Sequence, residues 1–242
     1  MGEHVWYLSY GSNLSMARFL CYIKGGRPHG GQRICAGASD DSEPLRSLGL
    51  VVRNMRMYYA RRSTTWQEGG VCFVDGTIGD SEVSLHTSLP EDVVTDLHCK
   101  IHDEMKCVPI QTLARAHLIT IDQFVDVVRQ ENHRAQFFDV DALHGVVKGD
   151  LTEATVVPNS WYGRVINLGS FDGNPVVTFT CITHDEEHRP PSAQYVSTIA
   201  RGIREVFPTM DVPDVLEYLT RRTPHRDSVD IDAAYGLLRE EA

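Results

Sequence analysis

The chain has 242 residues, of which 42% are hydrophobic, enough for one sizeable core or two small ones. Acidic residues outnumber basic ones by 33 to 23, and the resulting net charge of -10 argues against nucleic acid and anionic membrane surfaces as main partners. There is no basic stretch followed by an apolar run at the N-terminus, and no stretch approaches the roughly 20 apolar residues of a membrane span. We therefore expect a cytoplasmic protein, in which the 6 widely spaced cysteines are free thiols.

The first predicted element is a strand over Val5 to Ser9, and it ends in the run YGSNL at residues 10–14. Apolar residues at helical spacing follow, with Ser12 or Asn13 as a suitable N-cap. A glycine and two small polar residues at the start of a helix expose backbone N–H groups, which favours an anionic ligand. The other interpretation of the same run is a plain helix cap.

The middle of the chain alternates between strands and irregular segments. Residues 27–48 hold little periodicity and are expected to be a long loop, whereas residues 48–63 and 69–76 have the composition of strands. Residues 76–112 are the least regular part, and we interpret them as an insertion that contains one helix.

A helix with an informative polar residue is predicted directly after a strand over Ala114 to Ile119. Thr120 and Gln123 form a capping box at its start. The apolar stripe of this helix passes through Phe124 and Val128, and Glu131 falls at the edge of that stripe. Burial disfavours a charged carboxylate, so a glutamate in this position is suited to accept and return a proton. A glutamate that turns out to solvent, or that caps a neighbouring loop, is the alternative.

The last third of the chain is predicted to contain a hairpin and three helices. Asp172-Gly173 marks the hairpin turn, and Ser192 caps the helix that follows the two prolines. Two short helices near residues 212–220 and 231–239 finish the chain. Strands and helices are interspersed without a strict βαβ rhythm, which predicts a single α+β domain over residues 1–242.

Four motifs in this order resemble the γ-glutamylcyclotransferase family. They are the run YGSNL at residues 10–14, a glutamate at the end of a helix after a strand (Glu131), a tyrosine before the next strand (Tyr162), and the segment PPSAQY that ends in Tyr195. The chain departs from the family in its length, in its insertion over residues 76–112, and in Asn132, where the family usually has glycine.

The resemblance implies a fold, a reaction and a set of site residues. The fold is a small mixed β-barrel with helices packed around it. The reaction cleaves a small-molecule γ-glutamyl amide by attack of its own α-amine, which releases 5-oxoproline and a free amine without any cofactor. Deprotection of a natural-product intermediate is one use of such a reaction, and the family also allows a homodimer. The implied acid/base is Glu131, and the implied substrate-binding residues are Tyr10, Gly11, Ser12, Asn13, Leu14, Tyr162 and Tyr195.

Other interpretations remain open at this stage. The same pocket in a γ-glutamyl hydrolase or acyltransferase would give a different product, and a non-catalytic binding module would give none. His98 and His102, with Cys99 and Cys107, have a spacing that can bind zinc, although the flanking pattern fits no known finger. GGRPHGG at residues 25–31 lacks the ending of a phosphate-binding loop, and we interpret it as a loop near the pocket. A Cys72–His117 nucleophile pair would need the fold to bring the two residues together.

Overall fold

The first strand, β1 (His4–Ser9), lies inside a mixed sheet. The computed structural model describes residues 4–28, 34–75, 85–87, 111–133, 135–183, 187–221 and 228–239. β1 pairs antiparallel with β6 (Gln111–Thr120) on one side and parallel with β9 (Asn174–Thr180) on the other. The complete order of this seven-stranded sheet is β5-β2-β6-β1-β9-β8-β7. Its remaining strands are β2 (Arg46–Arg53), β5 (Leu85–His86), β7 (Glu153–Thr155) and β8 (Arg164–Phe171).

The α+β class is confirmed, but the described strands form an open sheet and not a barrel. The edge strands β5 and β7 stand at opposite ends of the order, and within the described ranges no strand joins them. A barrel needs continuous pairing around its circumference. Asn54 adopts a left-handed conformation directly after β2, and the chain there leaves the sheet to form a separate ribbon. This ribbon consists of β3 (Arg56–Ser63) and β4 (Gly69–Asp75), joined through the short 3-10 helix Thr64–Trp66.

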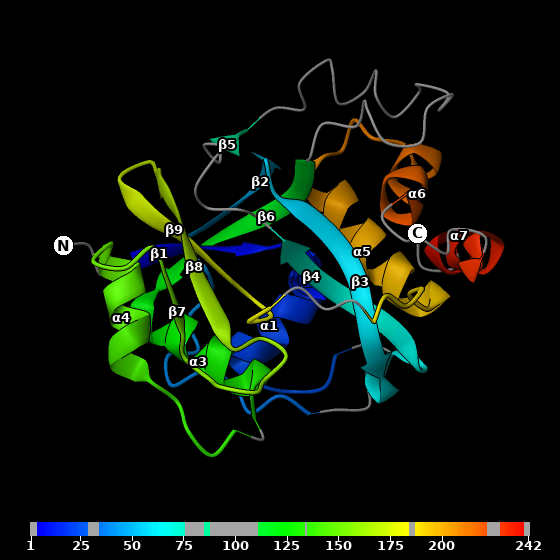
Figure 1. Ribbon diagram of the computed structural model, residues 1–242. Helices are drawn as coiled ribbons and strands as arrows, with labels where there is room; N and C mark the ends of the chain where they lie inside the picture. Colours follow the sequence, from blue (N-terminus) through cyan, green and yellow to red (C-terminus); the bar gives the residue numbers. More distant parts are fainter. Residues whose placement is uncertain are drawn as a thin grey trace.

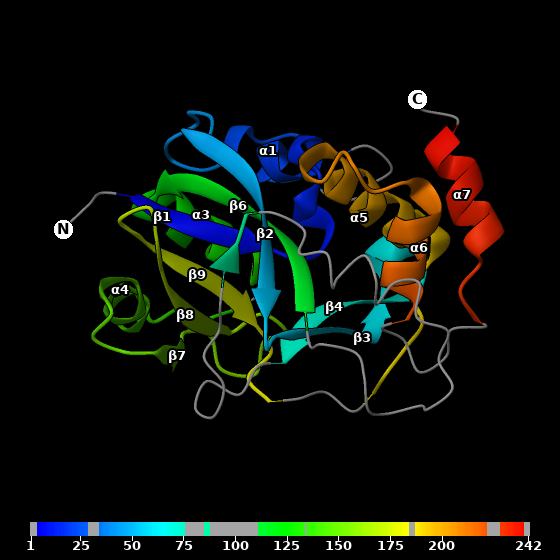
Figure 2. The same cartoon turned by 90° about the horizontal axis from the view of Figure 1, so that it is seen from above.

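Helices cover both faces of the sheet (Figures 1 and 2). The alternation of β1 explains why each face has its own core: Val5 and Tyr7 join one apolar cluster, whereas Trp6 and Leu8 join the other. The cluster around Tyr7 is closed by α1 (Met16–Lys24), α3 (Ile121–Glu131) and α4 (Val140–Lys148). The cluster around Trp6 is closed by the β3–β4 ribbon with α5 (Ala193–Val206), α6 (Val212–Thr220) and α7 (Ile231–Arg239).

Most local predictions for the described elements are confirmed. α3 begins with the Thr120–Gln123 capping box and ends at Glu131. Ser192 caps α5 through the backbone N–H of Tyr195. Asp172 and Gly173 both have positive φ angles, 49° and 77°, as a two-residue hairpin between β8 and β9 requires. Neither α4 nor β7 is predicted from the sequence.

The predicted start of the first helix is wrong. Ser12–Leu14 is a 3-10 turn, and α1 begins only at Met16, with Ser15 at its N-cap. Ser15 interrupts the helix, because its φ and ψ angles of -68° and 122° are extended. Side chains of β6 bind the turn before it: His117 Nε2 lies 3.2 Å from the carbonyl oxygen of Asn13, and Arg115 Nη1 lies 2.8 Å from that of Leu14.

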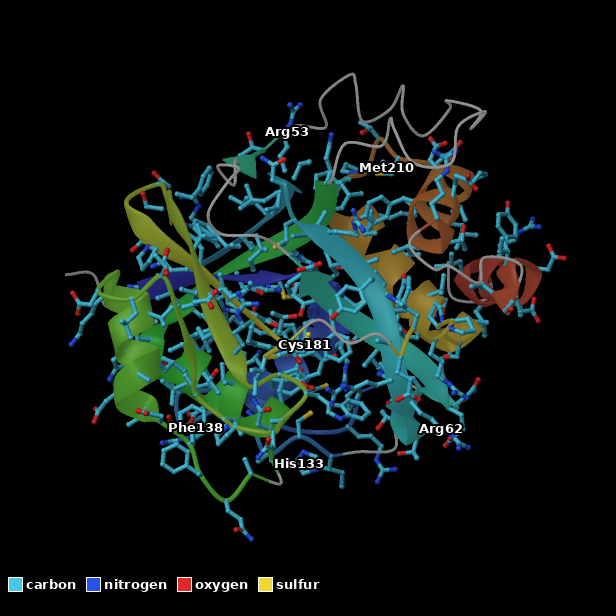
Figure 3. The ribbon with its side chains drawn as sticks, in the orientation of Figure 1. Arg53, Arg62, His133, Phe138, Cys181 and Met210 are labelled. Carbon is cyan, nitrogen blue, oxygen red and sulfur yellow. The ribbon has the colours of Figure 1, made fainter. Side chains whose placement is uncertain are left out.

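The predicted insertion over residues 76–112 lies outside the described residues, except for 85–87 and the first two residues of β6. Its predicted helix, with His98, Cys99, His102 and Cys107, also lies outside them, and the insertion remains a prediction. In the described part, Leu85–His86 pairs with Val51 and Val52 at the edge of the sheet. The four cysteines of the described residues form no disulfide with one another. Cys181 lies near the centre of the molecule, whereas Arg62, His133 and Phe138 lie at its periphery (Figure 3).

Candidate active site

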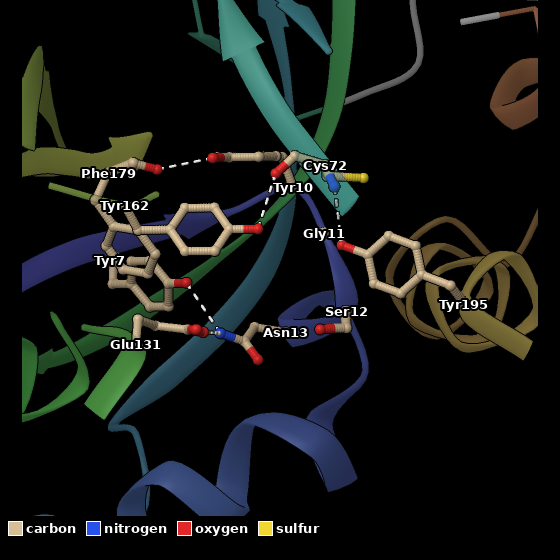
Figure 4. A pocket seen from close by; sticks show the side chains of 10 residues that line it. All are labelled: Tyr7, Tyr10, Gly11, Ser12, Asn13, Cys72, Glu131, Tyr162, Phe179 and Tyr195. Atoms are coloured by element: carbon tan, nitrogen blue, oxygen red, sulfur yellow. Dashed lines mark hydrogen bonds between the residues drawn. The ribbon is translucent and has the colours of Figure 1, made fainter. Parts of the chain in front are cut away.

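A pocket opens where β1 ends, between the C-terminus of α3 and the N-terminal part of α5 (Figure 4). The pocket is small, with a cavity volume of about 30 Å³, and it is open to solvent at its mouth. All of the predicted site residues line it except Leu14, which is fully buried in the core. The lining residues are Tyr7, Tyr10, Gly11, Ser12, Asn13, Cys72, Glu131, Tyr162, Phe179 and Tyr195.

Asn13 connects the predicted acid/base to the floor of the pocket. Its side-chain nitrogen donates to Glu131 Oε1 at 3.3 Å and to the Tyr7 hydroxyl oxygen at 3.2 Å. Its side-chain oxygen is buried and accepts no hydrogen bond from the part of the chain that the structure describes. The Glu131 carboxylate, held by the Asn13 side-chain nitrogen, can accept hydrogen bonds from an ammonium group in the pocket.

The turn after β1 presents backbone donors. Leu14 N–H donates to the Gly11 carbonyl at 2.9 Å, which closes the 3-10 turn. The N–H groups of Ser12 and Asn13 precede this bond, and neither donates to a described residue. A side chain at Gly11 would be crowded, because its Cβ would lie 3.1 Å from the Tyr195 hydroxyl oxygen. Two free N–H groups at a turn can bind a carboxylate or an oxyanion.

Buried polar side chains of β6 hold this turn from behind. His117 donates from Nε2 to the Asn13 carbonyl, and Ser47 Oγ lies 3.3 Å from its Nδ1. Arg115 donates to Ser47 Oγ at 2.7 Å and forms an ion pair with Glu205. Burial, and then the nearby Arg115 cation, lower the pKa of His117 to about 3. His117 is therefore neutral at physiological pH, and its single ring hydrogen is used on the turn.

The tyrosines of the pocket differ in how they use their hydroxyl groups. Tyr10 donates to the Phe179 carbonyl at 2.7 Å, and Tyr162 donates to the Cys72 carbonyl at 3.1 Å. Tyr195 accepts from the Cys72 N–H at 3.1 Å. Burial raises the pKa of Tyr10, Tyr162 and Tyr195 well above its ordinary value, so all three stay protonated. Tyr10 and Tyr162 both donate to backbone carbonyl groups. Tyr10 thereby joins the end of β1 to β9, and Tyr162 joins the segment before β8 to β4.

Three lining residues are absent from the sequence-based set: Tyr7, Cys72 and Phe179. Only Tyr7 had a signal in the sequence, because strand alternation places it on the face opposite to Trp6 and Leu8 and three residues before Tyr10. Cys72 and Phe179 reach the pocket from strands far away in the chain. Cys72 does not pair with His117, since the imidazole is bound to Asn13 and Ser47 and is stacked on Phe19 at 3.9 Å.

Two of the other sequence-based interpretations, a loop near the pocket at residues 25–31 and a metal site, can be compared with the described residues. Gly25 to Pro28, the part of the GGRPHGG segment that the structure describes, does not line the pocket. Within the described ranges, no group of three or more His, Cys, Asp or Glu side chains is placed to hold a metal ion. A search of the same ranges for a helix of membrane-spanning length and apolarity finds none.

Comparison with known proteins gives one similar sequence. No protein-family model matches the chain. Histone deacetylase 5 of Arabidopsis thaliana is 32% identical to it over 216 residues, which are 83% of this chain and 28% of that protein. The chain thus spans little more than a quarter of the length of this relative, and the similarity concerns one segment of it.

Solved structures with a similar arrangement include two named as γ-glutamyl cyclotransferases. One has a TM-score of 0.46 at 13% identity, and the other, a yeast enzyme specific to glutathione, has a TM-score of 0.33 at 12% identity. An uncharacterised human protein has a TM-score of 0.48 at 13% identity. Each comparison covers 98% of this chain and 99% of the other.

Proposed function

We propose that this chain is an enzyme of the γ-glutamylcyclotransferase type, which converts a γ-glutamyl amide into 5-oxoproline and a free amine. The observation that carries the proposal is the pair formed by Glu131 and Asn13. The Glu131 carboxylate lies in a small pocket, held by the Asn13 side chain, beside a turn whose Ser12 and Asn13 N–H groups donate to no described residue. A γ-glutamyl group has an ammonium and a carboxylate on one carbon, and these two features complement it.

The substrate ammonium, hydrogen-bonded to Glu131, first loses one proton to water. As the resulting neutral amine attacks the γ-carbonyl carbon, Glu131 accepts the second proton, so the ring nitrogen keeps one hydrogen. The C–N bond of the ring forms, and the carbonyl π electrons move to its oxygen. When this oxyanion collapses, the bond to the leaving nitrogen breaks, and Glu131 returns the proton to that nitrogen. Because both reacting groups belong to one molecule, holding the folded conformer supplies much of the rate.

The surrounding residues support this assignment of roles. The N–H groups of Ser12 and Asn13 are fixed by the carbonyl contacts of His117 and Arg115, and they are suited to the substrate α-carboxylate. The rings of Tyr10, Tyr162 and Tyr195 wall the pocket and exclude water from the amide that is broken.

The test is a mass-spectrometric screen of the purified chain against γ-glutamyl amides with different leaving amines. The panel holds γ-glutamyl dipeptides, glutathione, γ-glutamylamines and γ-glutamyl-protected natural-product intermediates. Release of 5-oxoproline from any member supports the proposal, and free glutamate assigns the pocket to a hydrolase instead. Absence of turnover across the panel contradicts the enzyme assignment. Saturable binding of a γ-glutamyl amide without turnover would then identify a binding module.

A further inference from the structure

The hydroxyl group of Tyr7 differs from those of Tyr10 and Tyr162 in how its hydrogen is used. Its oxygen accepts from the Asn13 side-chain nitrogen at 3.2 Å, but no acceptor among the described residues takes its own hydrogen. Tyr10 and Tyr162, by contrast, give theirs to backbone carbonyl groups. Tyr7 thus keeps an unused donor inside the pocket, beside the predicted acid/base (Figure 4).

This donor is fixed in place before any ligand binds. The Tyr7 ring is stacked on Phe179, with centroids 5.3 Å apart and an angle of 12° between the rings. Phe19 and Phe124 pack against it at 5.6 and 5.7 Å. Only 3% of Tyr7 is exposed, so its hydroxyl is preorganised and shielded from water. A fixed donor in such a setting stabilises developing negative charge far better than water does.

The hydroxyl also stays protonated at working pH. Burial raises the pKa of Tyr7 most, and the Glu131 carboxylate raises it further, whereas the Asn13 hydrogen bond and the Arg18 cation act in the opposite direction. Tyr22, Tyr162 and Arg18 are the other ionisable side chains whose pKa the Glu131 charge raises. A neutral phenol donates a hydrogen bond without giving up its proton, which is what an oxyanion requires.

We propose that Tyr7 is a catalytic residue that donates its hydroxyl hydrogen bond to the oxyanion formed at the substrate γ-carbonyl. Its oxygen and Glu131 Oε1 both lie within 3.3 Å of the same Asn13 nitrogen, so one side chain holds the donor and the base close to each other, and both residues line the pocket. The oxyanion forms on the carbon that the amine attacks, one bond from the nitrogen held at Glu131. The Ser12 and Asn13 N–H groups remain for the substrate α-carboxylate. This inference rests on the proposed function.

The experiment replaces the hydroxyl and keeps the ring. Tyr7→Phe is assayed for 5-oxoproline release with the γ-glutamyl amide that the wild-type chain turns over best. We expect kcat to fall by about 10²–10³-fold, while KM stays within about threefold of wild type, because the lost bond exists only in the transition state. Tyr218→Phe is the matched control: it removes a buried hydroxyl that accepts from the Leu113 N–H at 2.7 Å, away from the pocket. It should leave kcat and KM unchanged.

A second variant covers the case in which Tyr7→Phe does not fold. Incorporation of 3,5-difluorotyrosine at position 7 retains the ring and the hydroxyl but makes the hydroxyl easier to ionise. If the Tyr7 hydroxyl must stay protonated during the reaction, the basic limb of the plot of kcat against pH should move to lower pH, because the fluorinated hydroxyl ionises more easily. An unchanged profile overturns the proposal.

The outcomes separate this inference from the function on which it rests. Active wild type with Tyr7→Phe within threefold of its kcat overturns the role of Tyr7 alone. A raised KM with unchanged kcat also overturns it, because Tyr7 would then act in ground-state binding. If wild type releases no 5-oxoproline from any amide, the proposed function fails, and the oxyanion role of Tyr7 fails with it.

Discussion

The side-chain nitrogen of Asn13 lies 3.3 Å from Glu131 Oε1, although 118 positions separate the two residues in the chain. Asn13 sits in the turn after β1, and Glu131 is the last residue of α3. The two elements meet because every residue of β1 pairs with β6, and β6 leads directly into α3. This contact unites the two motifs from which the function is proposed, and four of the five predictions below depend on the site around it.

Glu131→Gln should lower turnover by about 10²–10⁴-fold, because the amide cannot take and return a proton. The shape of the side chain is kept, and so is its contact with Asn13 after a rotation of the amide. We therefore expect normal folding and substrate binding. Turnover is measured as 5-oxoproline release, and binding is measured by calorimetry. A variant with near-wild-type turnover would remove Glu131 from the mechanism.

Asn13→Ala should lower kcat and raise KM together, because it removes the side-chain donor that holds both the Glu131 carboxylate and the Tyr7 hydroxyl in the pocket. Two lost hydrogen bonds should also cost about 1–3 kcal/mol of stability. Ser12→Ala retains the backbone donors and should have a smaller effect on both constants. Kinetics and urea unfolding are measured on the same preparations. If only stability changes in Asn13→Ala, the turn is structural and the binding role is contradicted.

Gly202→Ala should displace the turn from behind. A Cβ at Gly202 in α5 would lie 2.3 Å from both the Leu14 carbonyl carbon and the Ser15 nitrogen, so the backbone must shift. Overpacking of this kind costs about 1–3 kcal/mol, and we expect KM to rise with it. Gly236→Ala is the matched control in α7, because nothing lies within 4 Å of its Cβ position. That variant should be neutral or more stable, and equal effects of the two changes would contradict the prediction.

Stability should depend on the protonation of His117. Its pKa falls from an ordinary value of 6.5 to about 3 in the folded chain, so the unfolded chain binds the additional proton between these values. The stability is fully present above about pH 6.5 and is lost as the pH falls toward 3. From pH 7.5 to 5, this group should account for about 2 kcal/mol. The free energy of unfolding in urea is measured at both pH values. His117→Gln should lose this contribution to the pH dependence, whereas His144→Gln, a partly exposed position in α4, should retain it.

The segment between β5 and β6 should govern the choice of leaving amine. It lies outside all four sequence motifs, and loops added to a scaffold commonly carry specificity. Replacement of residues 88–109 by a Gly/Ser linker keeps both flanking strands and should change the ranking of substrates in the screen. Cyclisation of a minimal γ-glutamyl amide should persist. His98→Ala is a milder probe of the same segment, and an unchanged ranking in a folded linker variant would exclude a role in recognition.

The sequence by itself determined the features that depend on neighbouring residues. The capping box of α3, the Ser192 cap of α5 and the Asp172-Gly173 hairpin turn are interactions across two or three positions. The place of Glu131 at the end of the apolar stripe follows from the helical period. Most of the residues that line the pocket were expected from the resemblance of four sequence motifs to a known family and not from local periodicity.

The tertiary structure alone decided how the turn after β1 is built and which side chains complete the pocket. The helix begins only at Met16, after the extended Ser15, and the turn before it is held by His117 and Arg115, about a hundred positions later. Cys72 and Phe179 enter the site through β4 and β9, whose positions depend on strand order and not on local pattern. A hydrogen bond between a backbone carbonyl and a side chain far away in the chain cannot be predicted from the local pattern of apolar and polar residues.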